Sequence, residues 1–128
     1  MLPAPLRMRR SGDFPLTIRG GVRAGRTTVV VHCRPRESGP GGEESAHEAH
    51  VGLVVSKAVG GAVVRNTVRR RLRGLVMEMR DLLPRGADVV VRALPPSASA
   101  DYSTLGSDLR SALATVERRL GERRTGRS

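Results

Sequence analysis

The chain has 128 residues, enough for one domain with a modest hydrophobic core. Its formal net charge of +11 comes from 22 arginines and one lysine against 12 acidic residues, and this favours a nucleic-acid partner. A single cysteine excludes an internal disulfide framework, and no apolar run approaches the roughly 20 residues of a membrane-spanning helix. No apolar segment of signal-peptide length opens the chain, so we expect a cytoplasmic protein. An anionic membrane surface is the alternative partner, but no basic amphipathic segment carries large aromatic anchors.

The first third of the chain predicts a flexible start, a short helix and a strand. Residues 1–10 are rich in Pro and Arg, and we expect them to be poorly ordered. Ser11-Gly12-Asp13 can begin a short helix through Phe14 and Ile18, which the glycines at 20 and 21 end. The β-branched segment 27–33 predicts a strand.

Residues 34–50 have the composition of a loop, with three Gly, two Pro, four Glu and no large apolar residue. We expect a disordered connection between two strands that pair with each other. The second of these strands is predicted at 51–56, where a nearly continuous apolar run favours an interior position in the sheet.

The second half of the chain predicts two helices around a strand. Apolar spacing predicts a long helix from 62 to 83, which ends before Pro84 and Gly86. A strand follows at 88–94, and an amphipathic helix at about 102–120. We therefore expect a single nucleic-acid-binding domain over 11–120 and a flexible basic tail over 121–128.

The start of the long helix is unusually basic, because residues 65–73 hold five arginines and no acidic residue. At about 100° per residue, one arc of this helix carries apolar side chains that should pack on the sheet: Val68, Leu72, Leu75, Val76 and Met79. A neighbouring arc forms what we call the basic ridge, made of Asn66, Arg69, Arg70, Arg73 and Arg80. Arg65 points the way the core arc points, which would place it at the mouth of a groove between helix and sheet. A solvated charged face is the plainer alternative, but no Glu at i+4 relieves these arginines.

One block of the sequence resembles the signature of the bacterial ribonuclease P protein subunit: Gly52-Leu53-x-Val55-Ser56-Lys57 followed by Gly60-x-Ala62-Val63-x-Arg65-Asn66-x-x-Arg69-Arg70-x-x-Arg73. The flanks match more loosely, at Arg9-Arg10-Ser11-x-Asp13-Phe14 and at Asp88-Val89-Val90-Val91-Arg92. The resemblance implies an α/β (α+β) two-layer sandwich with a four-stranded mixed sheet. Its element order would be helix–strand–strand–strand–helix–strand–helix, with a left-handed crossover, against the usual handedness.

The resemblance also implies a function. The family's protein joins a catalytic RNA, and together they remove the 5′ leader of precursor tRNA. The chemistry would belong to the RNA and to Mg²⁺ held by RNA and substrate, with no cofactor on the protein and no activity from the protein alone. Residues implied to bind RNA are Lys57, Arg65, Asn66, Arg69, Arg70 and Arg73. A cleft between the N-terminal helix and the sheet would hold the leader, lined by Phe14, Ile18 and Val31.

Two other functions compete with this one. A non-catalytic scaffold of the ribosome or nucleoid needs only the basic ridge. A protein-only hydrolase needs clustered carboxylates, whereas Asp13, Asp81 and Asp88 are scattered along the chain. His32-Cys33 with His47-x-x-His50 lacks the spacing of a closed structural zinc site.

Overall fold

The computed structural model describes residues 21–35 and 49–125. The predicted N-terminal helix, with Phe14 and Ile18, and most of the predicted loop lie outside the described residues. The described elements follow in the order β1 (Val22–Gly25), β2 (Val29–Pro35), β3 (His50–Val54), α2 (Ala62–Glu78), the 3-10 helix η3 (Arg80–Leu82), β4 (Ala87–Ala93), the 3-10 helix η4 (Pro95–Ala98) and α3 (Tyr102–Thr125).

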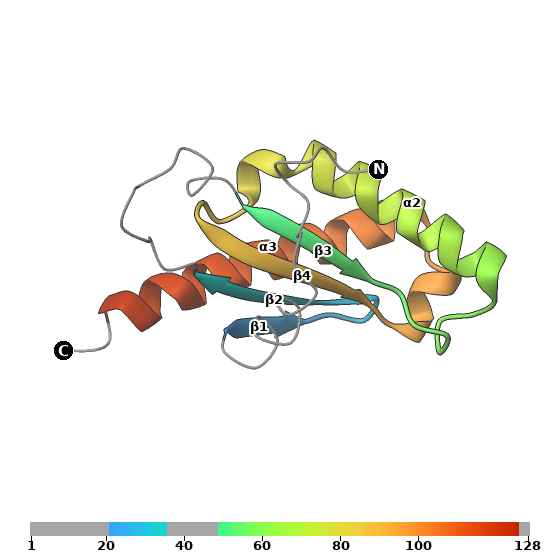
Figure 1. The fold of residues 1–128 in the computed structure, drawn as a ribbon, viewed down its shortest axis with the longest axis horizontal. Helices are drawn as coiled ribbons and strands as arrows, with labels where there is room; N and C mark the ends of the chain where they lie inside the picture. The colour runs from blue at the N-terminus through green and yellow to red at the C-terminus, as the bar shows by residue number, and fades with distance from the viewer. Residues whose placement is uncertain (1–20, 36–48, 126–128) are drawn as a thin grey trace.

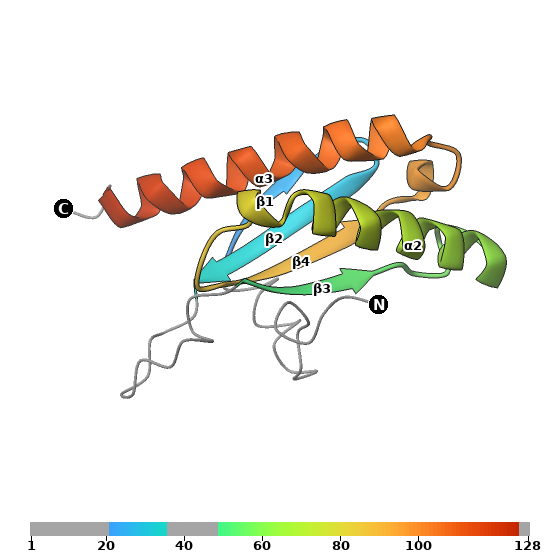
Figure 2. The same cartoon turned by 90° about the horizontal axis from the view of Figure 1, so that it is seen from above.

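The four strands form one mixed sheet in the order β1-β2-β4-β3. β2 pairs antiparallel with both β1 and β4, whereas β3 runs parallel to β4. Both long helices cover the same face of this sheet, α3 over β1 and β2 and α2 beside it (Figures 1 and 2). The two views also show that the connection from β3 through α2 to β4 is left-handed. The described elements therefore make the predicted two-layer α+β fold.

Two sequence-based predictions about the sheet are wrong. The strand predicted at 51–56 corresponds to β3, which lies at an edge of the described sheet rather than in its interior. It also does not pair with β2, because β4 lies between them. The apolar run suggested an interior strand because both faces of β3 are buried, even though β3 is an edge strand. Val51 belongs to the core under the helices, and Gly52, on the other face, is also buried.

The core lies between the sheet and the two helices. Alternate residues of β2 and β4 point into it, as the strand period of two requires. All five residues of the predicted core arc are buried, but the predicted end of the helix at 83 is wrong: α2 ends at Glu78, Met79 is its C-cap, and η3 follows. α3 reaches Thr125, so the predicted flexible tail is helical over its first five residues. The largest fully buried core side chains are Leu72, Leu105, Leu109, Leu113, Leu120, Val29, Val31, Val51, Val68, Val76 and Val89.

The two helices approach each other closely at two glycines. A Cβ atom on Gly106 of α3 would lie 3.0 Å from Cδ2 of Leu75, and one on Gly74 of α2 would lie 3.2 Å from the hydroxyl oxygen of Tyr102. Real Cβ contacts are rarely so short, so these glycines allow α2 and the start of α3 to pack together.

Polar contacts fasten the β1–β2 turn to α3. The backbone N–H and the hydroxyl of Thr28 both donate to Oδ2 of Asp108, at 3.1 and 2.7 Å. The Arg26 guanidinium donates to the hydroxyls of Ser111 and Thr115, at 2.9 and 2.7 Å. These bonds hold the β1 edge of the sheet against α3.

Candidate nucleic-acid interface

Four residues of the basic ridge lie on the flank of α2 beside the core contact, and the fifth, Arg80, lies in η3 after the helix ends. Asn66, Arg70 and Arg80 are exposed, while Arg69 and Arg73 are half-buried. Nη1 of Arg69 donates a 2.9 Å hydrogen bond to Oδ1 of Asn66, so the amide holds one guanidinium in place. None of the ion pairs recorded between described residues involves the ridge. Within the part of the chain that the structure describes, no ion pair compensates the positive charge of the ridge, which suits the ridge to a polyanion.

The N-terminus of α2 adds to this positive potential. Gly61 caps the helix without a side-chain hydrogen bond, and the first turn contains no acidic residue. Lys57 is exposed in the preceding turn, which is closed by the N–H of Gly60 donating to the Lys57 carbonyl at 3.2 Å. The turn with Lys57 and the positive end of the helix dipole thus lie next to the first residues of the ridge.

Arg65 behaves as the helical wheel predicts, because it turns partly toward the core. Its side chain is half-buried, and its Nε is fully buried without a hydrogen-bond partner among the described residues. A buried polar nitrogen of this kind costs free energy unless something pairs with it. A bound phosphate or carbonyl oxygen is the type of group that would satisfy it.

The face of the sheet away from the helices is also basic. Strand alternation places Arg23, His32 and Arg92 on this face, with Arg23 paired to His32 and Arg92 paired to the adjacent Val30. Arg23 and Arg92 are exposed, whereas His32 is buried. Burial, and then the charges of the two arginines, lower the pKa of His32 below its ordinary value, so its imidazole is neutral near pH 7.

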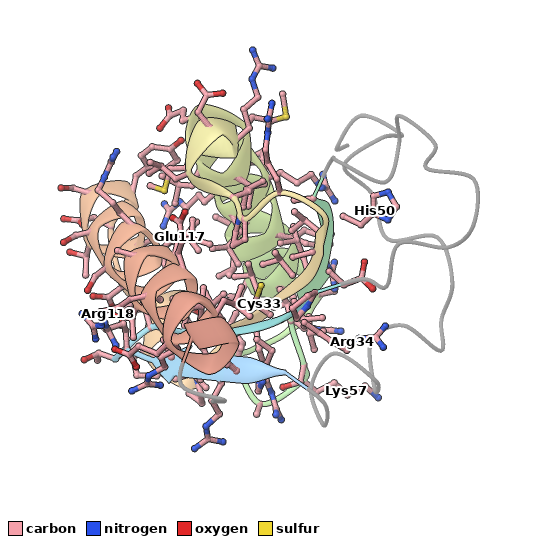
Figure 3. The ribbon with its side chains drawn as sticks, turned by 90° about the vertical axis from the view of Figure 1, so that its left-hand side faces the viewer. Cys33, Arg34, His50, Lys57, Glu117 and Arg118 are labelled. Atoms are coloured by element: carbon pink, nitrogen blue, oxygen red, sulfur yellow. The ribbon has the colours of Figure 1, made fainter. Side chains whose placement is uncertain are left out.

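Three strands meet in a polar cluster at one end of this face. Asp88 of β4 is almost completely buried; its Oδ2 lies 3.3 Å from Nη2 of Arg34 on β2, and its Oδ1 lies 3.8 Å from Nδ1 of His50 on β3. Figure 3 shows Arg34 and His50 on the side of the sheet away from α3. Asp88 therefore links its two neighbouring strands and removes part of the positive charge at this end.

The prediction that Val31 lines a cleft on this face is wrong. Val31 has no exposed surface and belongs to the core packed under α3. Its neighbours Val30 and His32 point the other way, because successive strand residues alternate between faces. Because the side-chain period of a strand is two, a prediction that is wrong by one residue places every side chain on the opposite face of the sheet.

Sequence reasoning missed Arg23 and Arg92 as candidate site residues. The signal was present in the alternation of 88–94, in which Arg92 is the only exposed residue of β4. It was absent for Arg23, because β1 is only four residues long and two of the four, Ala24 and Gly25, have little β propensity.

The described residues contain no group of three or more His, Cys, Asp or Glu side chains that could hold a metal ion. Cys33 is buried and faces the helices, away from His32 on the same strand. In the searched part of the chain, no helix is long and apolar enough to cross a membrane.

Comparison with known proteins gives one consistent result. The sequence matches the family model "Ribonuclease P" over residues 2–117. It is 48% identical over 134 residues to the ribonuclease P protein component of Salinispora tropica, covering 96% of this chain and 98% of the relative. It is 53% identical over 114 residues to that of Streptomyces bikiniensis, covering 88% of this chain and 93% of the relative.

Solved structures give the same fold. The RNase P protein of Staphylococcus aureus superposes with a TM-score of 0.71 at 21% identity, covering 86% of this chain and 94% of the other. That of Thermotoga maritima gives 0.69 at 24% identity, with coverages of 88% and 96%. The match of nearly the whole sequence to the family model, together with relatives near 50% identity, shows that this chain belongs to the ribonuclease P protein family.

Proposed function

We propose that this protein binds the catalytic RNA of ribonuclease P through the basic ridge, Lys57 and Arg65. Together with that RNA it would promote removal of the 5′ leader from precursor tRNA. The observation that carries the proposal is the ridge itself, a row of guanidinium groups along a well-packed helix for which the described residues supply no acidic partner. Family membership supports the ribonuclease P assembly as the setting.

A second surface would bind the leader. The sheet face that carries Arg23 and Arg92 lies opposite the helix layer. Family resemblance implies a leader cleft between such a face and an N-terminal helix containing Phe14 and Ile18. On the described part of this face there is no Phe, Tyr or Trp side chain and His32 is buried, so guanidinium groups would supply the contacts to leader phosphates and bases there.

Chemistry would remain with the RNA. Mg²⁺ is proposed to be held by the RNA and the substrate, and the described residues supply no carboxylate cluster that fits it. The protein's part would be electrostatic: its arginines take the place of cations that otherwise screen the repulsion between two RNA molecules. The cytoplasm, where precursor tRNA is processed in bacteria, is the proposed location.

Precursor-tRNA cleavage at low Mg²⁺, with a bacterial catalytic RNA, tests this function. The wild-type protein should restore cleavage that the RNA alone performs poorly, and the protein without RNA should cleave nothing. A triple variant with Arg69, Arg70 and Arg73 changed to Gln should restore little. Equal restoration by the triple variant would show that the ridge is not the RNA-binding surface.

A nucleic-acid scaffold is the second candidate, since a scaffold also needs a basic ridge. It predicts RNA binding without any effect on leader cleavage. The same assay therefore separates the two functions.

A further inference from the structure

Arg71 belongs to the basic run of residues 65–73, but it does not belong to the basic ridge. It lies two residues before Arg73, about 200° around the helix, and so projects from the other flank of the core arc. There its Nη1 donates a partly buried hydrogen bond of 2.9 Å to the carbonyl oxygen of Ala100. Its guanidinium is therefore already engaged with the protein, on the side away from the proposed RNA contact.

A second bond on the same flank joins the same two segments. Glu78 follows Arg71 by seven residues, which returns it to nearly the same direction on the helix. Its Oε1 accepts a 3.1 Å hydrogen bond from the hydroxyl of Tyr102, the first residue of α3. Gly74 lies between Arg71 and Glu78 in sequence and allows the Tyr102 hydroxyl to approach α2 closely.

The segment that receives these bonds is itself well fixed. Oδ1 of Asp101 accepts from the backbone N–H of Thr104 at 2.7 Å, and the Asp101 carbonyl accepts from the N–H of Leu105 at 3.1 Å. The side-chain hydrogen bond of Thr104, then its backbone hydrogen bond, and to a smaller extent the charge of Arg71, lower the pKa of the Asp101 carboxyl. We call Arg71, Glu78, Ala100, Asp101 and Tyr102 the α2–α3 latch.

We propose that Arg71 is a positioning residue: through the α2–α3 latch it fixes the rotation of α2 about its axis, and so sets the direction in which the basic ridge faces RNA. Because the hydrophobic effect is non-directional, burial of the core arc constrains the rotation of α2 less sharply than directional hydrogen bonds do. Directional bonds on the flank opposite the ridge oppose such a rotation. The inference rests on the proposed function, since the orientation of the ridge matters only if the ridge binds RNA.

The salt dependence of RNA binding distinguishes positioning from direct contact. Each phosphate contact contributes roughly 0.7–0.9 to the slope of log affinity against log salt concentration. A variant that loses a phosphate contact therefore has a shallower slope. In a variant that loses only the latch, a smaller fraction of the molecules holds the basic ridge in the orientation that binds RNA. Affinity then falls by the same factor at every salt concentration, and the slope stays unchanged.

The experiment compares Arg71→Met with the matched control Arg70→Met, which removes the same charge from the adjacent, exposed position. Affinity for the catalytic RNA is measured across a salt series, well below the unfolding temperature of each variant. Arg71→Met should bind about 3- to 10-fold more weakly, the equivalent of one net hydrogen bond, with the wild-type slope. Arg70→Met should lower the slope by roughly 0.7–0.9.

Tyr102→Phe is the second variant, because it removes the other latch bond without changing any charge. It should also weaken RNA binding with an unchanged slope, and it keeps the test informative if Arg71→Met does not fold. A shallower slope for Arg71→Met would show direct phosphate contact, and wild-type affinity in both latch variants would show a purely structural role; either overturns the proposal. If the wild-type protein itself fails to bind the RNA, the proposed function fails first, and that result is distinct from both.

Discussion

Arg69 and Asn66 lie one helical turn apart on α2 and are joined by a 2.9 Å hydrogen bond from Nη1 of the arginine to Oδ1 of the amide. Asn is a mediocre helix former, and here its side chain uses its acceptor to orient a cation. The NH₂ group of the same amide is exposed and has no recorded acceptor among the described residues. The pair therefore combines one fixed positive charge with one hydrogen-bond donor, which matches the mixed charge and acceptor pattern of an RNA backbone and its bases.

Asn66→Asp should weaken RNA binding more than Asn66→Ala. The aspartate keeps the acceptor for Arg69 but adds a negative charge that pairs with the guanidinium and repels phosphate. The alanine loses only the orienting bond and the donor. Because position 66 is exposed, the free energy of unfolding of both variants should lie within about 0.5 kcal/mol of the wild-type value. Binding titrations with catalytic RNA, alongside thermal unfolding, check the order; equal affinities for the two variants would contradict it.

Adjacent residues of α2 should separate binding from folding. Arg73→Ala should lower RNA affinity and reduce the salt slope by roughly 0.7–0.9, with little change in stability, since an unpaired surface arginine adds little to folding. Leu72→Ala should instead destabilise the protein by about 2–5 kcal/mol, because Leu72 is completely buried. Chemical unfolding and RNA titration of both variants make the comparison. Loss of stability in the arginine variant alone would show that the helix faces are reversed.

Neighbouring strand residues should differ in the same way on the sheet. Val31→Ala should destabilise the fold by roughly 2 kcal/mol, because it removes two methyl groups from the core. Arg92→Ala should leave stability nearly unchanged and reduce the preference for leader-bearing substrate. The measurements are chemical unfolding and the ratio of affinities for precursor and mature tRNA. A change in that ratio caused by Val31→Ala at full stability would reinstate Val31 as a cleft residue.

His32 should make the protein less stable in mild acid. Its pKa is lowered in the folded state, so the unfolded chain binds the proton more readily. The stabilising contribution is complete above the unfolded value near 6.5 and is lost as pH falls from there through the lower folded value. His32→Gln should remove this contribution, so the gap in Tm between wild type and variant should narrow from pH 7.5 to pH 5. A gap that widens toward acid pH would mean that the histidine is stabilised in its charged form.

Periodicity predicted the helices better than the sheet. The core arc of α2 was predictable because five apolar residues repeat at helical spacing, and the same pattern separates them from the ridge. The pairing of β3 was not predictable from its own apolar run, because burial on both faces does not require two neighbouring strands. The partner of β3 is β4, more than thirty residues later, and only the tertiary structure brings the two together.

The site was predictable where one helix carries it. Arg65, Asn66, Arg69, Arg70 and Arg73 lie on one continuous helix, so helix geometry alone fixes their relative directions. Arg23 and Arg92 come from two strands that do not pair with each other, and β2 lies between them. The different position of Arg71 was not predictable in this way. The sequence does not distinguish Arg71 from its neighbours in the basic run, and only its hydrogen bond to Ala100 does.

Discrimination between precursor and mature tRNA tests the central claim most directly. Affinity of the catalytic RNA for a leader-bearing precursor and for mature tRNA is measured with and without this protein, at one fixed salt and Mg²⁺ concentration. If the protein holds both the catalytic RNA and the leader, it should increase affinity for the precursor by a clearly larger factor than affinity for mature tRNA. Equal factors for the two substrates would mean that it acts only by neutralising charge, and would contradict the account.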